Sequence, residues 1–238
     1  MEDQDKAYFI NNSIFLKYKR RFDLFKFRSS QYLKSVVINE RIIEIPFAIG
    51  CLSTLPKGSK VLDLGCTEST FPLQAATLGY KVTGFDFRKY PYVHPNLRFV
   101  QGDILKLPFG AEEFDAVFCI STIEHIGLGF YNDPLAQEEA DHKALREAAR
   151  VLKKAGMLVL TVPYGTEIPN QHHRVYNQQN LRKLLGSFKV QEERYFSNGG
   201  KNNGSQSNFW EEVGQAKADQ VVSGDLANCV CVIKAVKG

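Results

Sequence analysis

The stretch Lys60-Val-Leu-Asp-Leu-Gly65 decides the fold that we expect for this chain. Residues 60–64 form a short apolar run, which is typical of a strand buried on both faces of a sheet. A polar turn follows the glycine, and residues 71–78 then show a helical pattern. A strand, a polar turn and a helix in this order predict a βα unit.

The same alternation continues from residue 40 to residue 196 and predicts a mostly parallel sheet covered by helices on both faces. No helical pattern separates the last two strands, so we expect the last strand to run antiparallel to its predecessor. The expected fold class is therefore α/β, a three-layer Rossmann-like sandwich with a mostly parallel seven-stranded sheet and an antiparallel last strand. The other expected strands are residues 81–86, 97–101, 114–121, 157–162, 188–195 and 228–236, and the later helices are residues 141–154 and 178–185.

The composition favours a cytoplasmic protein with reduced thiols. Its five cysteines are odd in number and form no C-x-x-C pattern, which argues against a disulfide framework. The first residues are acidic, and no run of about 18 apolar residues occurs, so we expect neither a signal peptide nor a membrane-spanning helix. We expect a monomer or a homodimer.

A basic segment between Lys17 and Lys34 stands out from the rest of the chain. It has seven basic residues against one acidic residue, with aromatic and aliphatic residues between them. One interpretation is an amphipathic helix laid over the core, and the other is a surface for peripheral contact with an anionic membrane or a phosphorylated substrate. The net charge of +4 is low for a nucleic-acid binder. We therefore divide the chain into an N-terminal helical, basic-aromatic extension, residues 1–45, forming a lid or acceptor side, and a main domain, residues 46–238.

An aspartate ends or follows each of three successive strands. Asp86 comes about 20 residues after Gly65, a position from which a carboxylate accepts both hydrogen bonds of a ribose diol. Asp103 follows the next strand, where it can accept from an adenine amino group. Aspartates after strands also form turns and cap helices, but three in register, with Asp63, indicate an adenosine-type ligand.

Six motifs resemble, in order and spacing, those of the class I S-adenosylmethionine-dependent methyltransferases. They are Val61-Leu-Asp-Leu-Gly-Cys66, Gly84-Phe-Asp86, Gln101-Gly-Asp103, Phe114-Asp-Ala-Val117, Ser121-Thr-Ile-Glu-His125 and Arg150-Val-Leu-Lys153. The resemblance covers roughly residues 58–190. It implies that Gly65 contacts the methionine part of S-adenosylmethionine, Asp86 the ribose, and Asp103 with Ile104 the adenine. The further cofactor-binding residues that it implies are Asp63, Cys66, Thr67, Phe87 and Ser121.

Four later motifs resemble a bacterial and archaeal group of this family that is associated with surface polysaccharide synthesis. They are Ile123-Glu-His-Ile-Gly-Leu-Gly129, Tyr131-Asn-Asp-Pro134, Thr161-Val-Pro-Tyr-Gly165 and His173-Arg-Val-Tyr176. The resemblance implies O-methylation of a sugar or glycan precursor, with N-methylation or another small metabolite left open.

The turn after the first strand departs from the family pattern. Thr67 and Ser69 stand where the family usually has glycine. Their side chains narrow the approach of the cofactor, although their hydroxyls can also donate to its carboxylate or cap the helix near Phe71. A non-catalytic relative is therefore one alternative. A dinucleotide-dependent oxidoreductase is another, but the chain lacks G-x-G-x-x-G. A cofactor-free interaction module is the third.

Two histidines are the candidate catalytic bases for a hydroxyl acceptor. His125 follows a strand at the rim where ligands of open α/β sheets bind, and His173 lies on a later loop expected over the same rim. On that loop, Arg174 can hold an acceptor phosphate or carboxylate and Tyr176 can stack on a ring. The alternatives are that His125 orders its loop and that Arg174 and Tyr176 brace theirs. No metal site is expected.

Overall fold

The computed structural model describes residues 39–129, 139–168, 172–186, 188–198, 209–224 and 226–238. The basic segment between Lys17 and Lys34 lies outside the described residues, as does nearly all of the expected extension. Within the described part, helix α2 (Arg41–Leu52) runs through the expected boundary at residue 45.

An eight-stranded sheet organises the described residues, in the order β3-β2-β1-β4-β5-β10-β7-β8. The first five strands of this order are parallel, and β10 runs antiparallel to both β5 and β7. The expected parallel sheet with an antiparallel last strand is confirmed, but the sheet has eight strands and not seven. The strands are β1 (Lys60–Leu64), β2 (Lys81–Asp86), β3 (Leu97–Gln101), β4 (Phe114–Ile120), β5 (Leu152–Pro163), β7 (Phe188–Ser197), β8 (Glu211–Val213) and β10 (Cys229–Lys237).

The additional strand is β8, a three-residue edge strand that pairs with β7. Its sequence, Glu-Glu-Val, has no apolar alternation, so the pattern of the chain gives no sign of it. A separate two-stranded sheet joins β6 (Thr166–Glu167) to β9 (Val222–Ser223). The loop expected after residue 163 therefore contains a short strand.

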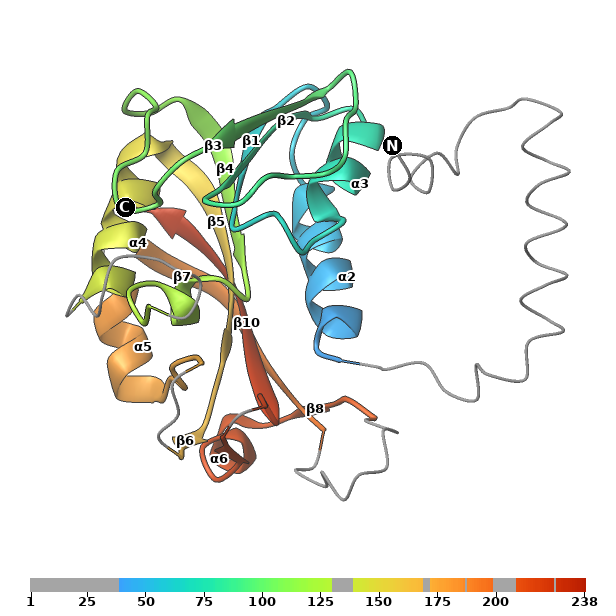
Figure 1. Ribbon diagram of the computed structural model, residues 1–238. Coiled ribbons are helices and arrows are strands. Elements are labelled where there is room, and N and C mark those ends of the chain that lie inside the picture. The colour runs from blue at the N-terminus through green and yellow to red at the C-terminus, as the bar shows by residue number, and fades with distance from the viewer. Residues whose placement is uncertain (1–38, 130–138, 169–171, 187, 199–208, 225) are drawn as a thin grey trace, which may run out of the picture.

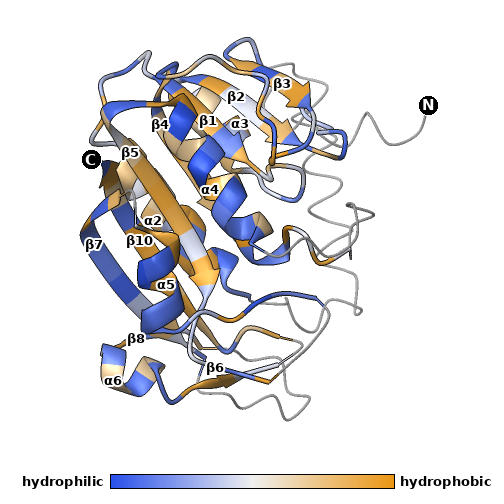
Figure 2. Cartoon of the chain, turned by 90° about the vertical axis from the view of Figure 1, so that its left-hand side faces the viewer, coloured by the Kyte–Doolittle hydropathy of each residue, from blue (hydrophilic) through white to orange (hydrophobic). Residues whose placement is uncertain are grey.

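Helices cover both faces of the large sheet (Figure 1). On one face, α2 and α3 (Phe71–Thr77) pack with Val61 and Phe118. On the other, α4 (Ala140–Val151) and α5 (Gln178–Leu184) pack with the opposite side chains of the same strands. Figure 2 shows the polar outer faces of α4 and α5 in front of the apolar strands. The three-layer arrangement follows from the alternation of side chains along buried strands.

The boundary between α4 and β5 differs from the expectation. The sequence predicted a helix to Lys154 and a strand from Met157, whereas the helix ends at Val151 and the strand begins at Leu152. Leu152 is extended, wholly buried and paired with Phe114. Burial and pairing of this leucine outweigh the helix propensity of the lysines and alanine that follow it.

The parallel register brings the carboxyl ends of four strands to one edge. Leu64, the last residue of β1, lies beside Phe85 of β2 and Cys119 of β4, and Asp86 of β2 lies beside Gln101 of β3. The turns after these strands therefore meet at the same edge. In open α/β sheets this edge is where ligands bind.

All five cysteines are free thiols buried in the fold. None of the helices described here combines the length and the apolar character that crossing a bilayer requires.

Gly165 should be far less tolerant of alanine than Gly79, although both have positive φ values, +125° and +92°. A Cβ at Gly165 would lie 2.2 Å from the carbonyl oxygen of Val221, whereas a Cβ at Gly79 meets nothing within 4 Å. We expect G79A to lower the free energy of unfolding by about 1 kcal/mol, the cost of the left-handed conformation. G165A should lower it by more than about 3 kcal/mol because a backbone must also move. Urea unfolding measures both values, and equal losses would contradict the packing at β6 and β9.

Candidate active site

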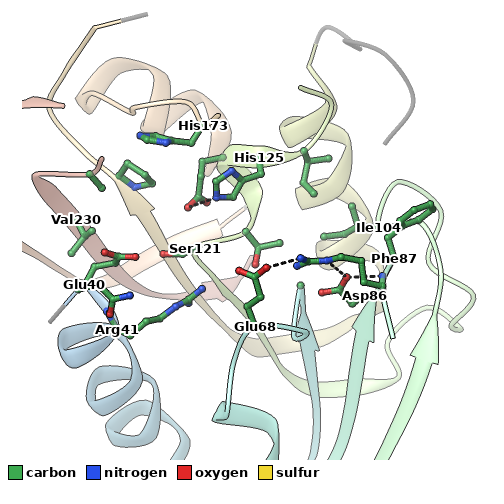
Figure 3. A pocket seen from close by; sticks show the side chains of 18 of the residues that line it. Glu40, Arg41, Glu68, Asp86, Phe87, Ile104, Ser121, His125, His173 and Val230 are labelled. Atoms are coloured by element: carbon green, nitrogen blue, oxygen red, sulfur yellow. Dashed lines mark hydrogen bonds and ion pairs between the residues drawn. The ribbon is translucent and has the colours of Figure 1, made fainter. Parts of the chain in front are cut away.

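A cavity of about 460 Å³ opens at the carboxyl edge of the sheet (Figure 3). Its walls come from the turns after β1, β2, β3 and β4, from the start of α2, and from the far end of the sheet near β10. A volume of this size suits a small organic ligand. Eight of the residues expected in the site line it: Gly65, Asp86, Phe87, Asp103, Ile104, Ser121, His125 and His173.

Gly65 is the point where the turns after β1 and β4 touch. Its φ is +76°, and a Cβ there would lie 2.2 Å from the side chain of Thr122. Its N–H donates to the carbonyl oxygen of Phe85 at 2.8 Å. Only glycine satisfies both the backbone conformation and the close approach, so the backbone of this turn borders the cavity without a side chain.

The two hydroxyl residues of the turn, Thr67 and Ser69, do not line the cavity. The hydroxyl of Thr67 donates to the carbonyl oxygen of Arg88 at 3.3 Å. Ser69 is buried, and its Oγ accepts the N–H of Phe71, the first residue of α3, at 3.1 Å. Ser69 therefore has the role expected at the start of the helix near Phe71. Neither side chain blocks the site.

Asp86 joins the turn after β1 to the turn after β2. One carboxylate oxygen accepts the N–H of Thr67 at 2.9 Å, and the other accepts the N–H of Arg88 at 2.8 Å. Nη1 of Arg88 also lies 2.6 Å from Oε1 of Glu68, and both residues line the cavity. Nε of Arg88 lies 3.6 Å from Oδ1 of Asp86. A carboxylate has about four acceptor positions, so Asp86 can still accept from a ligand.

The walls beyond Asp86 are apolar with one carboxylate. Phe87 is 52% exposed, and Ile104 is buried on the neighbouring turn. Oδ1 of Asp103 accepts the N–H of Leu105 at 2.8 Å, so this oxygen has the turn-forming role that aspartate often takes after a strand. Asp103 still lines the cavity.

Asp63 and Cys66 are buried behind the cavity, and their side chains do not line it. Burial raises the pKa of Asp63 well above its usual range, and Oδ2 has no hydrogen-bond partner among the described residues. Burial also raises the pKa of Cys66, and its Sγ would lie 3.0 Å from a Cβ built on Gly84. The implied contact of these two side chains with the cofactor is therefore not seen in the geometry.

A buried polar network supports the wall near Ser121. The hydroxyls of Ser121 and Thr161 donate to Oε1 of Glu44 at 2.5 and 2.7 Å. Oε2 of Glu44 lies 3.3 Å from Nη1 of Arg41, which lines the cavity. Burial raises the pKa of Glu44, which is wholly buried. Neither Arg41 nor Glu44 is among the residues predicted from the sequence, although a glutamate among the apolar residues 42–49 is a usable signal.

His125 is held in one tautomer. Its Nδ1 lies 2.6 Å from the carbonyl oxygen of His172, and because a carbonyl only accepts, Nδ1 carries the proton. In the neutral ring Nε2 then carries the lone pair that a base needs. Burial lowers the pKa of His125 and so favours the neutral form at pH 7. Nε2 lies 3.7 Å from Oε1 of Glu124.

His173 lies near His125, as expected, with ring centroids 6.1 Å apart. The structure thus brings both candidate bases to one cavity. Among the described residues, no group of three or more histidines, cysteines or carboxylates is arranged to hold a metal ion.

Arg174 and Tyr176 brace their loop and do not line the cavity, contrary to the expectation that they meet the acceptor. Arg174 donates through Nη1 to the carbonyl oxygen of Ile126 at 2.7 Å. The hydroxyl of Tyr176 donates to Oδ2 of Asp141 at 2.9 Å, and its ring is 2% exposed. The sequence places this loop near the rim of the sheet. It does not indicate whether the side chains of the loop face the cavity or the rest of the protein.

Comparisons with known proteins agree with this architecture. Residues 62–160, less than half of the chain, match a family model described as a methyltransferase domain. The demethylmenaquinone methyltransferase of Staphylococcus saprophyticus is 34% identical over 134 residues, which is 50% of this chain and 52% of that protein. The chain spans about half the length of the curated relatives it matches.

Solved structures show the same fold at low sequence identity. The 1,6-didemethyltoxoflavin-N1-methyltransferase of Burkholderia thailandensis, with bound S-adenosylhomocysteine, is 16% identical with a TM-score of 0.56, covering 94% of this chain and 88% of that one. The [4+2]-cyclase SpnF is 17% identical with a TM-score of 0.58, covering 87% and 86%. Residues 62–160 therefore match the methyltransferase domain in sequence, and the described sheet has the Rossmann-like architecture found in methyltransferases.

Replacing Glu124 by glutamine should stabilise the protein, and the gain over the wild type should be larger at pH 8 than at pH 5. Burial raises the pKa of Glu124 to about 8 in the fold. Between pH 4.5 and pH 8 the unfolded chain loses this proton while the folded protein keeps it, so stability falls as the pH rises. Glutamine cannot ionise, so the gain of E124Q should be on the order of 3 kcal/mol larger at pH 8.

Denaturant melts at the two pH values measure this difference. E167Q, at an exposed position of β6, is the matched control and should show no difference. Parallel pH profiles for E124Q and the wild type would contradict a protonated Glu124.

Proposed function

We propose that this chain is an S-adenosylmethionine-dependent methyltransferase that binds its cofactor in the cavity at the carboxyl edge of the sheet. The observation that carries the proposal is the position of Asp86, whose carboxylate is fixed between two turns and keeps acceptor capacity toward the cavity. The family match over residues 62–160 supports the same activity. The Burkholderia neighbour, with S-adenosylhomocysteine bound, supports the same cofactor.

The residues present fit an adenosyl cofactor. Asp86 would accept from the ribose hydroxyls, and the flat ring of Phe87 with Ile104 would enclose the adenine beside Asp103. Gly65 presents backbone at the cavity without a side chain, and any Cβ there would collide with Thr122. The cofactor supplies the activated methyl group when bound, so the chain has to bind, orient and exclude water.

His125 is the base in this proposal. A hydroxyl acceptor holds its proton at neutral pH, so a neutral imidazole near the transferred methyl group assists the reaction. Nδ1 of His125 carries a proton that it donates to the carbonyl oxygen of His172, so Nε2, which lies 3.7 Å from Oε1 of Glu124, would be the atom that receives the acceptor proton. His173 lies close enough to contact the same acceptor.

The part of the cavity beyond His173 has an apolar wall. Its side chains are Pro163, Trp210, Leu226, Ala227 and Val230. Asn198 also lines the cavity, and Nε1 of Trp210 has no hydrogen-bond partner among the described residues. These two side chains offer few partners for the several hydroxyls of a sugar, so the wall favours a less polar acceptor than the sugar or glycan suggested by the sequence. The curated relatives are named for a quinone substrate, demethylmenaquinone. We propose a small acceptor with an apolar face and a hydroxyl group.

The alternatives lack a specific observation in their favour. The hydroxyls of Thr67 and Ser69 are hydrogen-bonded to the backbone, and neither residue lines the cavity, so they provide no reason for a non-catalytic protein. The likeness to a [4+2]-cyclase shows that this fold also serves other reactions. Binding and transfer therefore have to be tested separately.

The first test concerns cofactor binding. D86N keeps the shape of Asp86 but removes the charge and one acceptor, so we expect the Kd for S-adenosylhomocysteine to rise by about 10- to 100-fold. D115N, at the opposite end of the sheet where Asp115 pairs with Lys153, should bind as the wild type does. Isothermal titration calorimetry gives both values. A wild type that does not bind the ligand, or a D86N variant that binds equally well, would refute the site.

The second test concerns His125. We expect H125Q to lower kcat by about 10²- to 10⁴-fold while the cofactor Kd changes little. Because burial lowers the pKa of His125 below 6.5, the wild-type rate should rise with pH only on the acid side of that value and level off near neutrality. Transfer of a labelled methyl group to a demethylmenaquinol analogue and to a nucleotide sugar tests both acceptor classes. An unchanged rate in H125Q would exclude this base.

A further inference from the structure

Arg41 is fixed at the cavity wall by contacts to two elements. Its Nη1 donates to the carbonyl oxygen of Ile120, the last residue of β4, at 3.2 Å and pairs with Glu44 at 3.3 Å. Both contacts use Nη1, and the described residues provide no partner for Nη2 or Nε. The side chain is 26% exposed, and Figure 3 shows it extending from α2 toward Ser121. Nη1 of the guanidinium is thus bonded within the protein, and Nη2 and Nε can donate to a ligand.

Glu44 holds this arrangement at a cost to stability. It is wholly buried and has three polar partners: Arg41, Ser121 and Thr161. Well-packed apolar residues in place of a buried ion pair are often neutral or stabilising. Stability therefore does not explain the network. Its effect in the structure is to hold the guanidinium of Arg41 and the side chain of Ser121 at the cavity.

Arg88 is the other cationic side chain among the described residues that line the cavity. It pairs with Glu68 at 2.6 Å and lies 3.6 Å from Asp86 at the end of β2. An anionic group at the end of β4 would therefore meet Arg41 and not Arg88. In Figure 3, Arg41 lies on the side of Ser121, and Asp86, the neighbour of Arg88, lies on the opposite side of the cavity.

We propose that Arg41 binds the carboxylate at the amino-acid end of the cofactor and that Glu44 is its positioning residue. The inference rests on the proposed function, because Asp86 would place the ribose at one end and Gly65 the sulfur in between. The planar guanidinium is suited to a carboxylate because two parallel N–H groups can donate to its two oxygens. Arg41 would take over an anion-binding role that the turn at Thr67 does not perform, since the N–H of Thr67 is already bonded to Asp86.

Decarboxylated S-adenosylmethionine is the matched ligand for testing this, because it differs from S-adenosylmethionine only by the missing carboxylate. Calorimetry with both ligands on the full chain gives an affinity ratio for each variant. We expect the wild type to bind S-adenosylmethionine about 10- to 100-fold more tightly than the decarboxylated ligand. In R41A this ratio should fall to about 1, with the affinity for the decarboxylated ligand unchanged.

Two further variants separate position from charge. R41K keeps the charge without the planar donor pair and should retain only part of the ratio. E44Q leaves Arg41 intact but weakens its anchor, so the ratio should fall several-fold. R182A, which breaks an exposed ion pair with Glu193, is the control and should keep the wild-type ratio. Urea unfolding of each variant, measured without ligand, verifies that it is folded.

The outcomes distinguish this inference from the proposed function. A wild type that binds neither ligand overturns both. A wild type that prefers S-adenosylmethionine, together with an R41A variant that keeps the preference, overturns only the role of Arg41. An R41A variant that is folded but loses affinity for both ligands equally also overturns it, because the effect is then not specific to the carboxylate.

Discussion

The carboxylate of Asp86 is the interaction on which the geometry of the cavity depends. It accepts one N–H from the turn after β1 and one from the turn after β2, so it fixes the distance between two loops that pairing of the strands alone would leave adjustable. Gly65 completes the constraint because its backbone packs directly against Thr122 after β4. Three strand ends are thereby locked together around one opening.

Buried carboxyl groups concentrate behind this opening. Glu44, Asp63 and Glu124 are each at most 1% exposed, and burial raises the pKa of all three. Such groups lower the stability of a fold. Their clustering at one edge of the sheet is the distribution expected where a site is maintained at the expense of stability.

The sequence predicts the features that depend on local pattern and fails where distant segments meet. Strands β1, β2 and β3 have the expected bounds because apolar runs and glycine-containing turns mark them, and Gly65, Asp86 and Asp103 follow because each comes at a strand end. Arg41 lies 79 residues from Ile120, its partner, and no local pattern encodes that contact. Arg174 and Tyr176 lie on the expected loop, but which way a loop side chain points depends on partners such as Asp141.

The most direct measurement is a crystal structure of the protein grown with S-adenosylhomocysteine. The account predicts density for the ligand along the carboxyl edge, with its ribose on the free acceptor positions of Asp86 and the bonds from Thr67 and Arg88 to that carboxylate retained. A ligand bound at another surface, or a cavity that stays empty at saturating ligand, would contradict it.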